Sequence, residues 1–114
     1  MIKAGLDIVY IPKIRRLMQN KNFIRKVFHK SEIKNFTAEH LAGIFAVKEA
    51  FFKALGKKIN WHLIEIKKEK SGKPKINFSN EIKKNLKNTS IEISISHEKD
   101  YAIALVFIFG KIKY

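Results

Sequence analysis

Asp7, Glu49 and Lys53 are the residues of this chain whose types and surroundings are best suited to chemistry. Asp7 stands between Leu6 and Ile8 and is the only acid among the first 31 residues. It is either an edge residue that faces water or a partly buried group with a partner, and its apolar neighbours favour the second. An Asp and a Glu from distant segments can together hold one hard cation, with water and phosphate oxygens as the other ligands. That arrangement is typical of Mg²⁺ in phosphoryl transfer.

Glu49 lies in a segment, residues 41–55, whose other charged members are Lys48 and Lys53. A helix that is apolar on most of its circumference is buried, and charges on it are costly unless they are paired or bound. The three charges fall within an arc of about 140°. Glu49 and Lys53 could form an ordinary i,i+4 salt bridge worth about 0.3 kcal/mol. Alternatively, Lys48 and Lys53 neutralise phosphate oxygens beside a metal bound to Glu49.

Two further segments offer polar groups. Ser94-Ile95-Ser96-His97 ends a strand, where a lone His is by default a surface residue. A Ser–His pair also suggests nucleophilic hydrolysis, but the nucleophile elbow and its glycines are missing, so we reject that interpretation. Gly72-Lys73-Pro74 is a turn that could contact a phosphate, although alone it is only a turn.

The elements that must position these groups indicate an α+β fold, with an antiparallel sheet packed on one long buried helix plus short helices. Residues 2–9 alternate as a strand, and Pro12 ends it or opens a helix. Residues 13–28 read as short helical pieces. Ser31 and Thr37 are each placed to cap a helix, and the long buried helix after Thr37 stops at Gly56.

The second half of the chain reads mainly as strands. We expect strands over 61–69 and 75–78, a helix capped by Ser79 that runs through Leu86, and a hairpin of strands 91–97 and 101–109. The last strand is apolar on both faces, which predicts that it is central or lies at a subunit interface.

Composition limits the remaining possibilities. The chain has 114 residues, enough for one domain over residues 1–114, and 46% of them are hydrophobic. There are no cysteines, so disulfides and thiolate chemistry are excluded. We find no apolar run of membrane-spanning length and no signal peptide, and expect a cytoplasmic protein without a membrane partner. The net charge of +14 predicts a phosphate-rich or acidic partner, or else reflects a general bias toward lysine.

Four segments taken together resemble the holo-acyl-carrier-protein synthase family, the small bacterial 4′-phosphopantetheinyl transferases. They are Gly5-Leu6-Asp7-Ile8-Val9, residues 45–56 around Lys48-Glu49-Ala50, Gly72-Lys73-Pro74, and Ser94-Ile95-Ser96-His97 with Tyr101-Ala102. The likeness spans nearly the whole chain, and the segment around Lys48-Glu49-Ala50 is its most specific part.

The resemblance implies a 4′-phosphopantetheinyl transferase fold and transfer of phosphopantetheine from coenzyme A to a serine of apo-acyl carrier protein. It implies Mg²⁺ held by Asp7 and Glu49, and a homotrimer with each active site at a subunit interface. Lys53, with Lys48, would balance charge on the leaving phosphate. The proton acceptor is Glu49 or a water on the metal. The residues expected at the nucleotide phosphates are Gly72, Lys73, Pro74, Ser96 and His97.

The acidic carrier protein would account for the positive charge. Basic residues surround apolar ones between positions 13 and 26, which suits an acidic helix with apolar anchors, although a solvated surface helix has the same pattern. The expected docking residues are Lys13, Arg15, Arg16, Leu17, Met18, Lys21, Phe23, Ile24, Arg25 and Lys26.

The chain departs from the family pattern at three positions. Ile44 stands where the family often has Arg, Tyr10 replaces a commonly acidic residue, and Lys13 replaces a common Arg, keeping the charge but losing the bidentate fork. These changes concern docking and one charged contact, and leave the two metal-binding acids in place.

Two other classes compete with the enzyme. A basic nucleic-acid-binding module fits the charge, but the basic residues are scattered, no RNP-like Phe motif is present, and the acids Asp7 and Glu49 have no use there, so we expect no nucleic-acid partner. A purely structural oligomer subunit predicts that Asp7→Asn and Glu49→Gln change stability without changing any activity.

Overall fold

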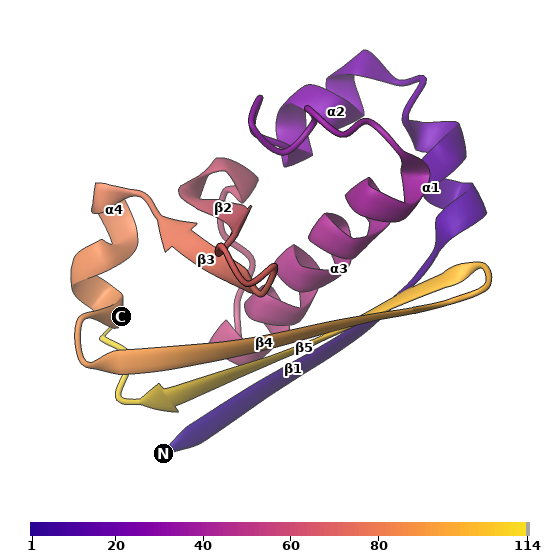
Figure 1. The fold of residues 1–114 in the computed structure, drawn as a ribbon. Coiled ribbons are helices and arrows are strands. Elements are labelled where there is room, and N and C mark those ends of the chain that lie inside the picture. The colour runs from indigo at the N-terminus through magenta and orange to yellow at the C-terminus, as the bar shows by residue number, and fades with distance from the viewer. Residues whose placement is uncertain (114) are drawn as a thin grey trace.

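The computed structural model describes residues 1–113. In it α3 lies between the larger sheet on one side and the short helices and the smaller sheet on the other (Figure 1). The described elements, in chain order, are β1 (Ile2–Tyr10), α1 (Ile11–Leu17), α2 (Lys21–Val27), α3 (Ala38–Leu55), the 3₁₀ turn η1 (Trp61–Leu63), β2 (Ile64–Lys68), β3 (Pro74–Phe78), α4 (Asn80–Lys83), the 3₁₀ turn η2 (Lys84–Leu86), β4 (Thr89–Glu98) and β5 (Tyr101–Gly110). The α+β class expected from the sequence is confirmed.

The larger sheet has three antiparallel strands in the order β1-β5-β4, and α3 packs across β1 and β5. β5 is therefore the central strand, as its two-sided apolar pattern predicted. The register places Asp7 beside Ala104, which in turn pairs with Ile95. His97 pairs with Ala102 on β5. The acid of β1 and the imidazole of β4 thus lie on the two outer strands of one sheet.

Backbone contact sets the spacing between β1 and α3. A Cβ atom built on Gly5 would lie 1.7 Å from the carbonyl oxygen of Ala50, a separation that no side chain can tolerate. Glycine at position 5 therefore lets the helix backbone rest directly on the strand backbone. Because Asp7 is two residues from Gly5 and Glu49 precedes Ala50, this contact positions both acids.

The ends of α3 carry the caps that the sequence predicts. The Thr37 hydroxyl accepts a hydrogen bond from the His40 amide at 3.2 Å, and Gly56 closes the helix in the left-handed region with φ of 87°. Ser31 caps no helix; its hydroxyl instead donates to Glu65 across the structure.

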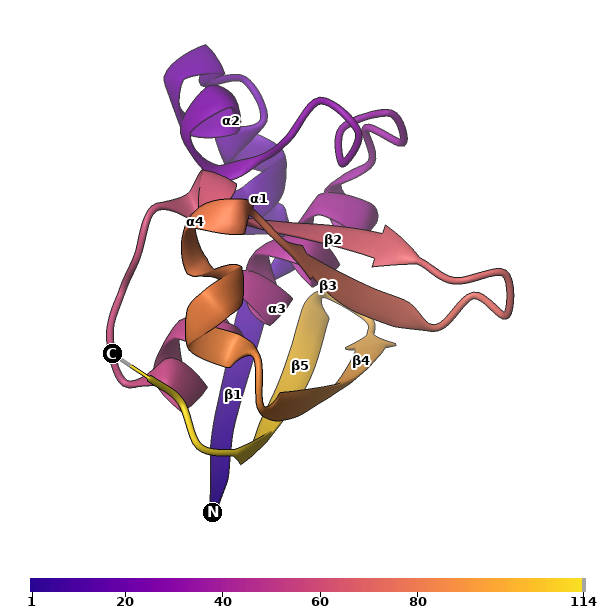
Figure 2. The same ribbon diagram turned by 90° about the vertical axis from the view of Figure 1, so that its left-hand side faces the viewer.

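The smaller sheet pairs β2 with β3, and its connecting loop projects from the body in Figure 2. The strand expected over 61–69 begins only at Ile64, because Trp61 enters a 3₁₀ turn in which the Asn60 side chain accepts from the His62 amide. That turn lets the Trp61 ring stack on Phe45 with 5.3 Å between ring centroids.

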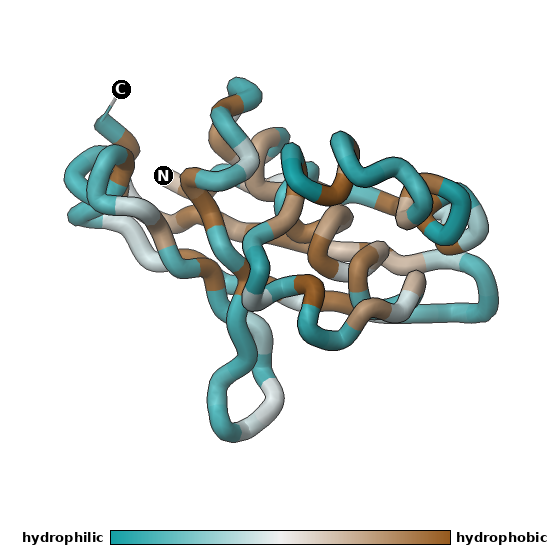
Figure 3. The backbone as a smooth tube through the Cα atoms, turned by 90° about the horizontal axis from the view of Figure 1, so that it is seen from above, coloured by the Kyte–Doolittle hydropathy of each residue, from teal (hydrophilic) through white to brown (hydrophobic). Residues whose placement is uncertain are grey.

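The outer face of the three-stranded sheet is apolar along β1 and β5 and uncovered. Ile2, Leu6 and Ile8 are 64%, 58% and 61% exposed, and on β5 Phe107 and Phe109 are partly exposed. The buried side of β1 instead carries Gly5 and Val9. Figure 3 shows hydrophobic positions (brown) along the strands and hydrophilic ones (teal) in the projecting loops. Within residues 1–113, no helix combines the length and apolar character needed to span a bilayer.

Candidate active site

Asp7 is partnered, as its apolar neighbours predicted. Its side chain is 14% exposed, and the Lys53 ammonium donates to a carboxylate oxygen of Asp7 at 3.1 Å and to the Leu6 carbonyl at 2.9 Å. Lys53 therefore reaches from α3 to the backbone and side chain of β1. The alternative of an i,i+4 salt bridge between Lys53 and Glu49 is not what the structure shows, because Glu49 pairs with Lys58 at 3.5 Å.

Asp7 and Glu49 line the same cavity, which has a volume of about 420 Å³. Burial raises the pKa of Asp7 above its ordinary value, the hydrogen bond and charge of Lys53 lower it, and the nearby Glu49 carboxylate raises it again. The two acids thus interact electrostatically within the folded chain. Lys13 and Tyr10 also line the cavity, so one of the residues predicted for partner docking borders the acid pair.

The acid pair is suited to a hard cation. Two carboxylates whose charges repel each other in one cavity are stabilised by a divalent ion, and oxygen donors are what Mg²⁺ prefers. Among the described residues there is no group of three or more His, Cys, Asp or Glu side chains able to hold a metal. Phosphate oxygens and water would therefore have to supply the other ligands.

Lys48 requires a correction. It was expected beside a phosphate together with Lys53, but its side chain is completely buried and its ammonium donates to Glu32 at 2.8 Å and to the Val27 carbonyl at 2.7 Å. No phosphate can reach this group without unfolding its surroundings. The physical reason is that α3 buries most of its circumference, so a side chain one residue away from Glu49 points into the core.

His97 lies on the other side of α3 from the acids. Its Nε2 atom is 3.2 Å from the Glu39 carbonyl oxygen, and it borders a cavity of about 470 Å³ that Gly43 and Ile44 of α3 also line. Ser96 alternates to the opposite, exposed face of β4. The structure therefore brings His97 to a cavity and leaves Ser96 outside it.

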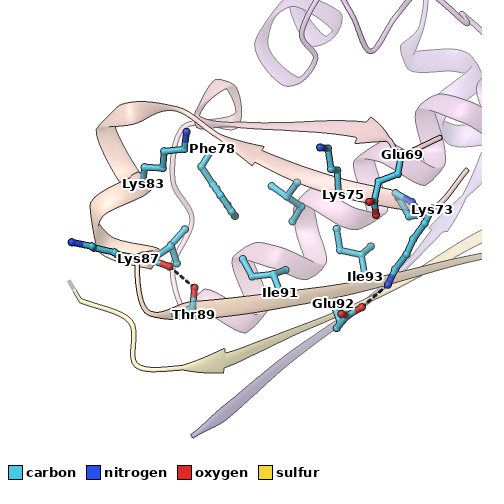
Figure 4. Close-up of a pocket in the computed structure, with 13 residues that line it drawn as sticks. Glu69, Lys73, Lys75, Phe78, Lys83, Lys87, Thr89, Ile91, Glu92 and Ile93 are labelled. Carbon is cyan, nitrogen blue, oxygen red and sulfur yellow. Dashed lines mark hydrogen bonds and ion pairs between the residues drawn. The ribbon is translucent and has the colours of Figure 1, made fainter. Parts of the chain in front are cut away.

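Of the residues in the Gly72-Lys73-Pro74 turn, only one lies at the His97 cavity. Pro74 lines the His97 cavity. Lys73 extends away and pairs with Glu92 at 2.8 Å, at the edge of a separate hollow between β3 and β4 (Figure 4). The charge and hydrogen bond of Glu92 raise the pKa of Lys73. Gly72 holds the turn with φ of 88° and borders none of the described cavities around Asp7 or His97.

The two cavities are distinct within one chain. Among residues 1–113, no residue lines both the cavity of Asp7 and Glu49 and the cavity of His97, because α3 lies between them. One protomer therefore does not bring all the predicted site residues together.

Basic residues are exposed along α1 and α2, while the apolar ones between them are half-buried. Arg15 reaches Glu39 at 3.2 Å in an exposed ion pair. The expected docking segment is thus a basic surface with limited apolar exposure. The set is Lys13, Arg15, Arg16, Lys21, Arg25 and Lys26, with Leu17, Met18, Phe23 and Ile24 packed partly against the core.

Several polar residues that line the His97 cavity were not predicted. They come from the segment before α3, from α3 itself and from β2: Lys34, Asn35, His40, Lys67 and Lys68. Glu32, the buried partner of Lys48, was missed as well. No local signal marks Glu32, since its partner is 16 residues away and the segment that carries it is an irregular turn.

Comparison with known proteins identifies the family of this chain. Residues 3–106 match the family model of the 4′-phosphopantetheinyl transferase superfamily. A holo-[acyl-carrier-protein] synthase of Ehrlichia chaffeensis is 40% identical, with 98% of this chain and 99% of the relative aligned. The enzyme of the same name from a Geobacillus species is 38% identical over 95% of this chain and 96% of its own length.

Solved structures give the same result. The crystal structure of holo-[acyl-carrier-protein] synthase from Neisseria meningitidis superposes with a TM-score of 0.87 at 30% identity, covering 96% of this chain and 100% of its own. The Helicobacter pylori enzyme in complex with coenzyme A superposes with a TM-score of 0.85 at 33% identity, with the same coverage. This chain belongs to the 4′-phosphopantetheinyl transferase superfamily, among the holo-[acyl-carrier-protein] synthases.

Proposed function

We propose that this chain transfers the 4′-phosphopantetheine group of coenzyme A to a serine of apo-acyl carrier protein, and that the reaction depends on Mg²⁺ bound by Asp7 and Glu49. The observation that carries the proposal is that these two acids, 42 positions apart in the chain, line one cavity with Lys53 bonded to Asp7. Coenzyme A as the substrate is supported by the complex of the Helicobacter pylori relative.

In the proposed reaction the serine oxygen bonds to the phosphorus that carries pantetheine, and the bond from that phosphorus to the bridging oxygen breaks. Adenosine 3′,5′-bisphosphate leaves with the negative charge, and the serine proton passes to Glu49 or to a water beside it. A bound Mg²⁺ would offset pyrophosphate charge and polarise the phosphorus. The Lys53 side chain is more than half exposed, so its ammonium can turn from Asp7 toward the leaving phosphate.

The nucleotide part of coenzyme A is proposed to occupy the His97 cavity. That cavity combines basic groups for phosphates with an apolar wall that includes Ile44 and Ile95. Because Ile44 replaces a common Arg, charge there must come from neighbours such as Lys34 and Lys67. Since α3 separates this cavity from the acids of the same chain, the proposed complete site joins the acids of one protomer to the His97 cavity of another.

A homotrimer is proposed for the same reason, and the uncovered apolar face of the three-stranded sheet supports self-association. Monomeric proteins rarely leave a contiguous apolar surface of this kind exposed. Leu6 pairs with Leu105 and Ile8 with Ile103 on that face, so the apolar stripe runs continuously across two strands. The acidic carrier protein is proposed to dock on the basic surface of α1 and α2, next to Lys13 at the acid cavity.

The experiment is to incubate the protein with coenzyme A, MgCl₂ and apo-acyl carrier protein, and to measure the carrier by mass spectrometry. One phosphopantetheine group per carrier is the expected gain. EDTA, Asp7→Ala and Glu49→Ala should each abolish it, whereas Glu81→Ala, which removes an exposed acid on α4, should not. Transfer that persists in EDTA would refute the metal site.

A further inference from the structure

The carboxylate of Glu32 joins three separate segments of the chain. One oxygen accepts from the His29 amide at 2.8 Å and from the Lys48 ammonium at 2.8 Å, and the other accepts from the Ile66 amide at 2.7 Å. These donors belong to the turn before α3, to α3, and to β2. The Glu32 side chain is completely buried, so no water substitutes for any of the three.

The backbone of Glu32 adds a further link. Its carbonyl oxygen is 3.0 Å from Nε2 of His40, on the first turns of α3. Lys48 completes its own shell with the Val27 carbonyl, and its ammonium lies 5.8 Å from the centre of the Phe28 ring. Every charged atom of the pair is therefore occupied, which is the condition under which a buried ion pair holds a defined geometry.

The segments that Glu32 joins are those that form one wall of the His97 cavity. The turn before α3 contributes Lys34 and Asn35, α3 contributes His40 and Gly43, and β2 contributes Lys67. Without Glu32, the edge amide of Ile66 loses its acceptor and the turn loses its tie to α3. The shape of the cavity wall therefore depends on a side chain whose charged end faces the core.

We propose that Glu32, paired with Lys48, is a positioning residue that sets the geometry of the His97 cavity and thereby the affinity for the nucleotide part of the substrate. The inference rests on the proposed function for the identity of that substrate. It assigns Lys48 to the support of the neighbouring cavity rather than to phosphate binding. Because Glu32 contacts neither Asp7 nor Glu49, its loss should change binding in the His97 cavity without changing the chemistry at the two acids.

The test is steady-state kinetics of Glu32→Gln, with coenzyme A and carrier protein varied separately. A Gln side chain offers one acceptor oxygen where Glu offers two, so one backbone amide loses its partner in either orientation. The KM for coenzyme A should rise about 10-fold, while kcat and the KM for the carrier protein change less than about 2-fold. Glu81→Gln, an exposed isosteric control, should leave all three constants unchanged.

Loss of stability alone would lower the folded fraction and hence the apparent kcat, without changing KM. An unchanged KM for coenzyme A in Glu32→Gln, measured well below its unfolding temperature, would therefore overturn the proposal. If this variant does not fold, Glu32→Gln with Lys48→Met removes the unpaired buried charge but still leaves one amide unpaired. The same rise in KM is then expected, and its absence is again decisive.

Amide hydrogen exchange separates failure of this inference from failure of the proposed function. In Glu32→Gln the amide of His29 or of Ile66, whichever loses its acceptor, should exchange at least about 10-fold faster, whether or not the protein has transferase activity. Wild-type protein that transfers nothing would refute the function while this exchange result still tests the role of Glu32. Unchanged exchange at both amides would refute that role even in an active enzyme.

Discussion

The ammonium of Lys53 lies 3.1 Å from a carboxylate oxygen of Asp7, and yet the pKa of Asp7 is raised rather than lowered. Desolvation by burial outweighs the attraction of the lysine, and the Glu49 carboxylate adds repulsion. Asp7 is therefore a charge that the fold holds at a cost. Groups held in this way are candidates for function, because a bound cation recovers what the fold loses.

The first prediction concerns Asp7→Asn in metal-free buffer. Because burial raises the pKa of Asp7 above its ordinary value in the folded state, the folded state binds the proton more tightly than the unfolded state. The contribution of Asp7 to the free energy of unfolding is fully present below its unfolded-state pKa. It is lost as the pH rises from that value through the higher folded-state pKa. Asn cannot ionise, so at pH 7 the variant should melt at the same temperature as the wild type or a few degrees higher.

Thermal melts at pH 7 and at about pH 4 check this sign, since the difference between the two proteins should shrink at the lower pH. Transferase activity of Asp7→Asn should fall at least about 100-fold. MgCl₂ should stabilise the wild type and not the variant. A variant that melts well below the wild type at pH 7 would show that the Lys53 contact outweighs burial.

The second prediction concerns Gly43, which faces His97 from α3. A Cβ atom at this position would meet Nε2 of His97 at 3.4 Å, an ordinary contact. Replacing a helix-interior glycine by alanine stabilises a helix by up to about 1 kcal/mol, so Gly43→Ala should unfold at a slightly higher denaturant concentration. The added methyl group also enters the His97 cavity, so the KM for coenzyme A should rise a few-fold.

Gly5→Ala is the matched comparison, because there the added Cβ would meet backbone at 1.7 Å. That variant should lose about 3 kcal/mol or more, or fail to fold. Equal denaturation midpoints for the two alanine variants would contradict the different packing of the two glycines.

The third prediction tests the apolar sheet face. Leu6→Asp places a charge on a side chain that is 58% exposed in the single chain, so the fold of one protomer should persist. In an assembled trimer the same charge would be buried, and association should weaken by several kcal/mol. Light scattering after gel filtration should show a shift toward monomer, with activity lost in parallel. Ser94→Asp, on the polar strand of the same face, should remain assembled.

The fourth prediction tests the carrier-docking surface. Arg16 is exposed on α1 and has no ion pair among the described residues, so Arg16→Glu reverses charge without breaking a contact. The KM for the carrier protein should rise about 10-fold at low salt, and the effect should diminish as salt screens it. Lys111→Glu makes the same change in charge beyond the end of β5 and should have little effect. Equal losses in both variants would indicate a general response to net charge.

Local patterns were sufficient for much of the fold. The alternation of β1, the caps at Thr37 and Gly56 and the hairpin of β4 and β5 all follow from neighbouring residues, and each was predicted. Asp7 and Glu49 line one cavity, and their common site was expected from the family resemblance of the segments that carry them. Local patterns did not show which way individual side chains point, into the core or into a cavity.

Lys48 shows why. Its neighbour Glu49 faces a cavity, but one step of 100° around the helix turns Lys48 into the interior, toward a partner on an irregular turn. Ser96 does not line the cavity that His97 borders, for the same geometric reason: successive residues of a strand point to opposite faces. Ser31 was misplaced because its hydroxyl bonds to Glu65, far along the chain. The strand start at Trp61 was misplaced because the Asn60 side chain accepts from the His62 amide and closes a 3₁₀ turn there.

The contact of Gly5 with the Ala50 carbonyl has a practical consequence for redesign. Since two main chains touch there, the gap between Asp7 and Glu49 is fixed by peptide geometry and is insulated from the identity of the surrounding core residues. Extensive repacking of the interior should therefore preserve the spacing of the two acids, whereas one methyl group at position 5 would destroy it.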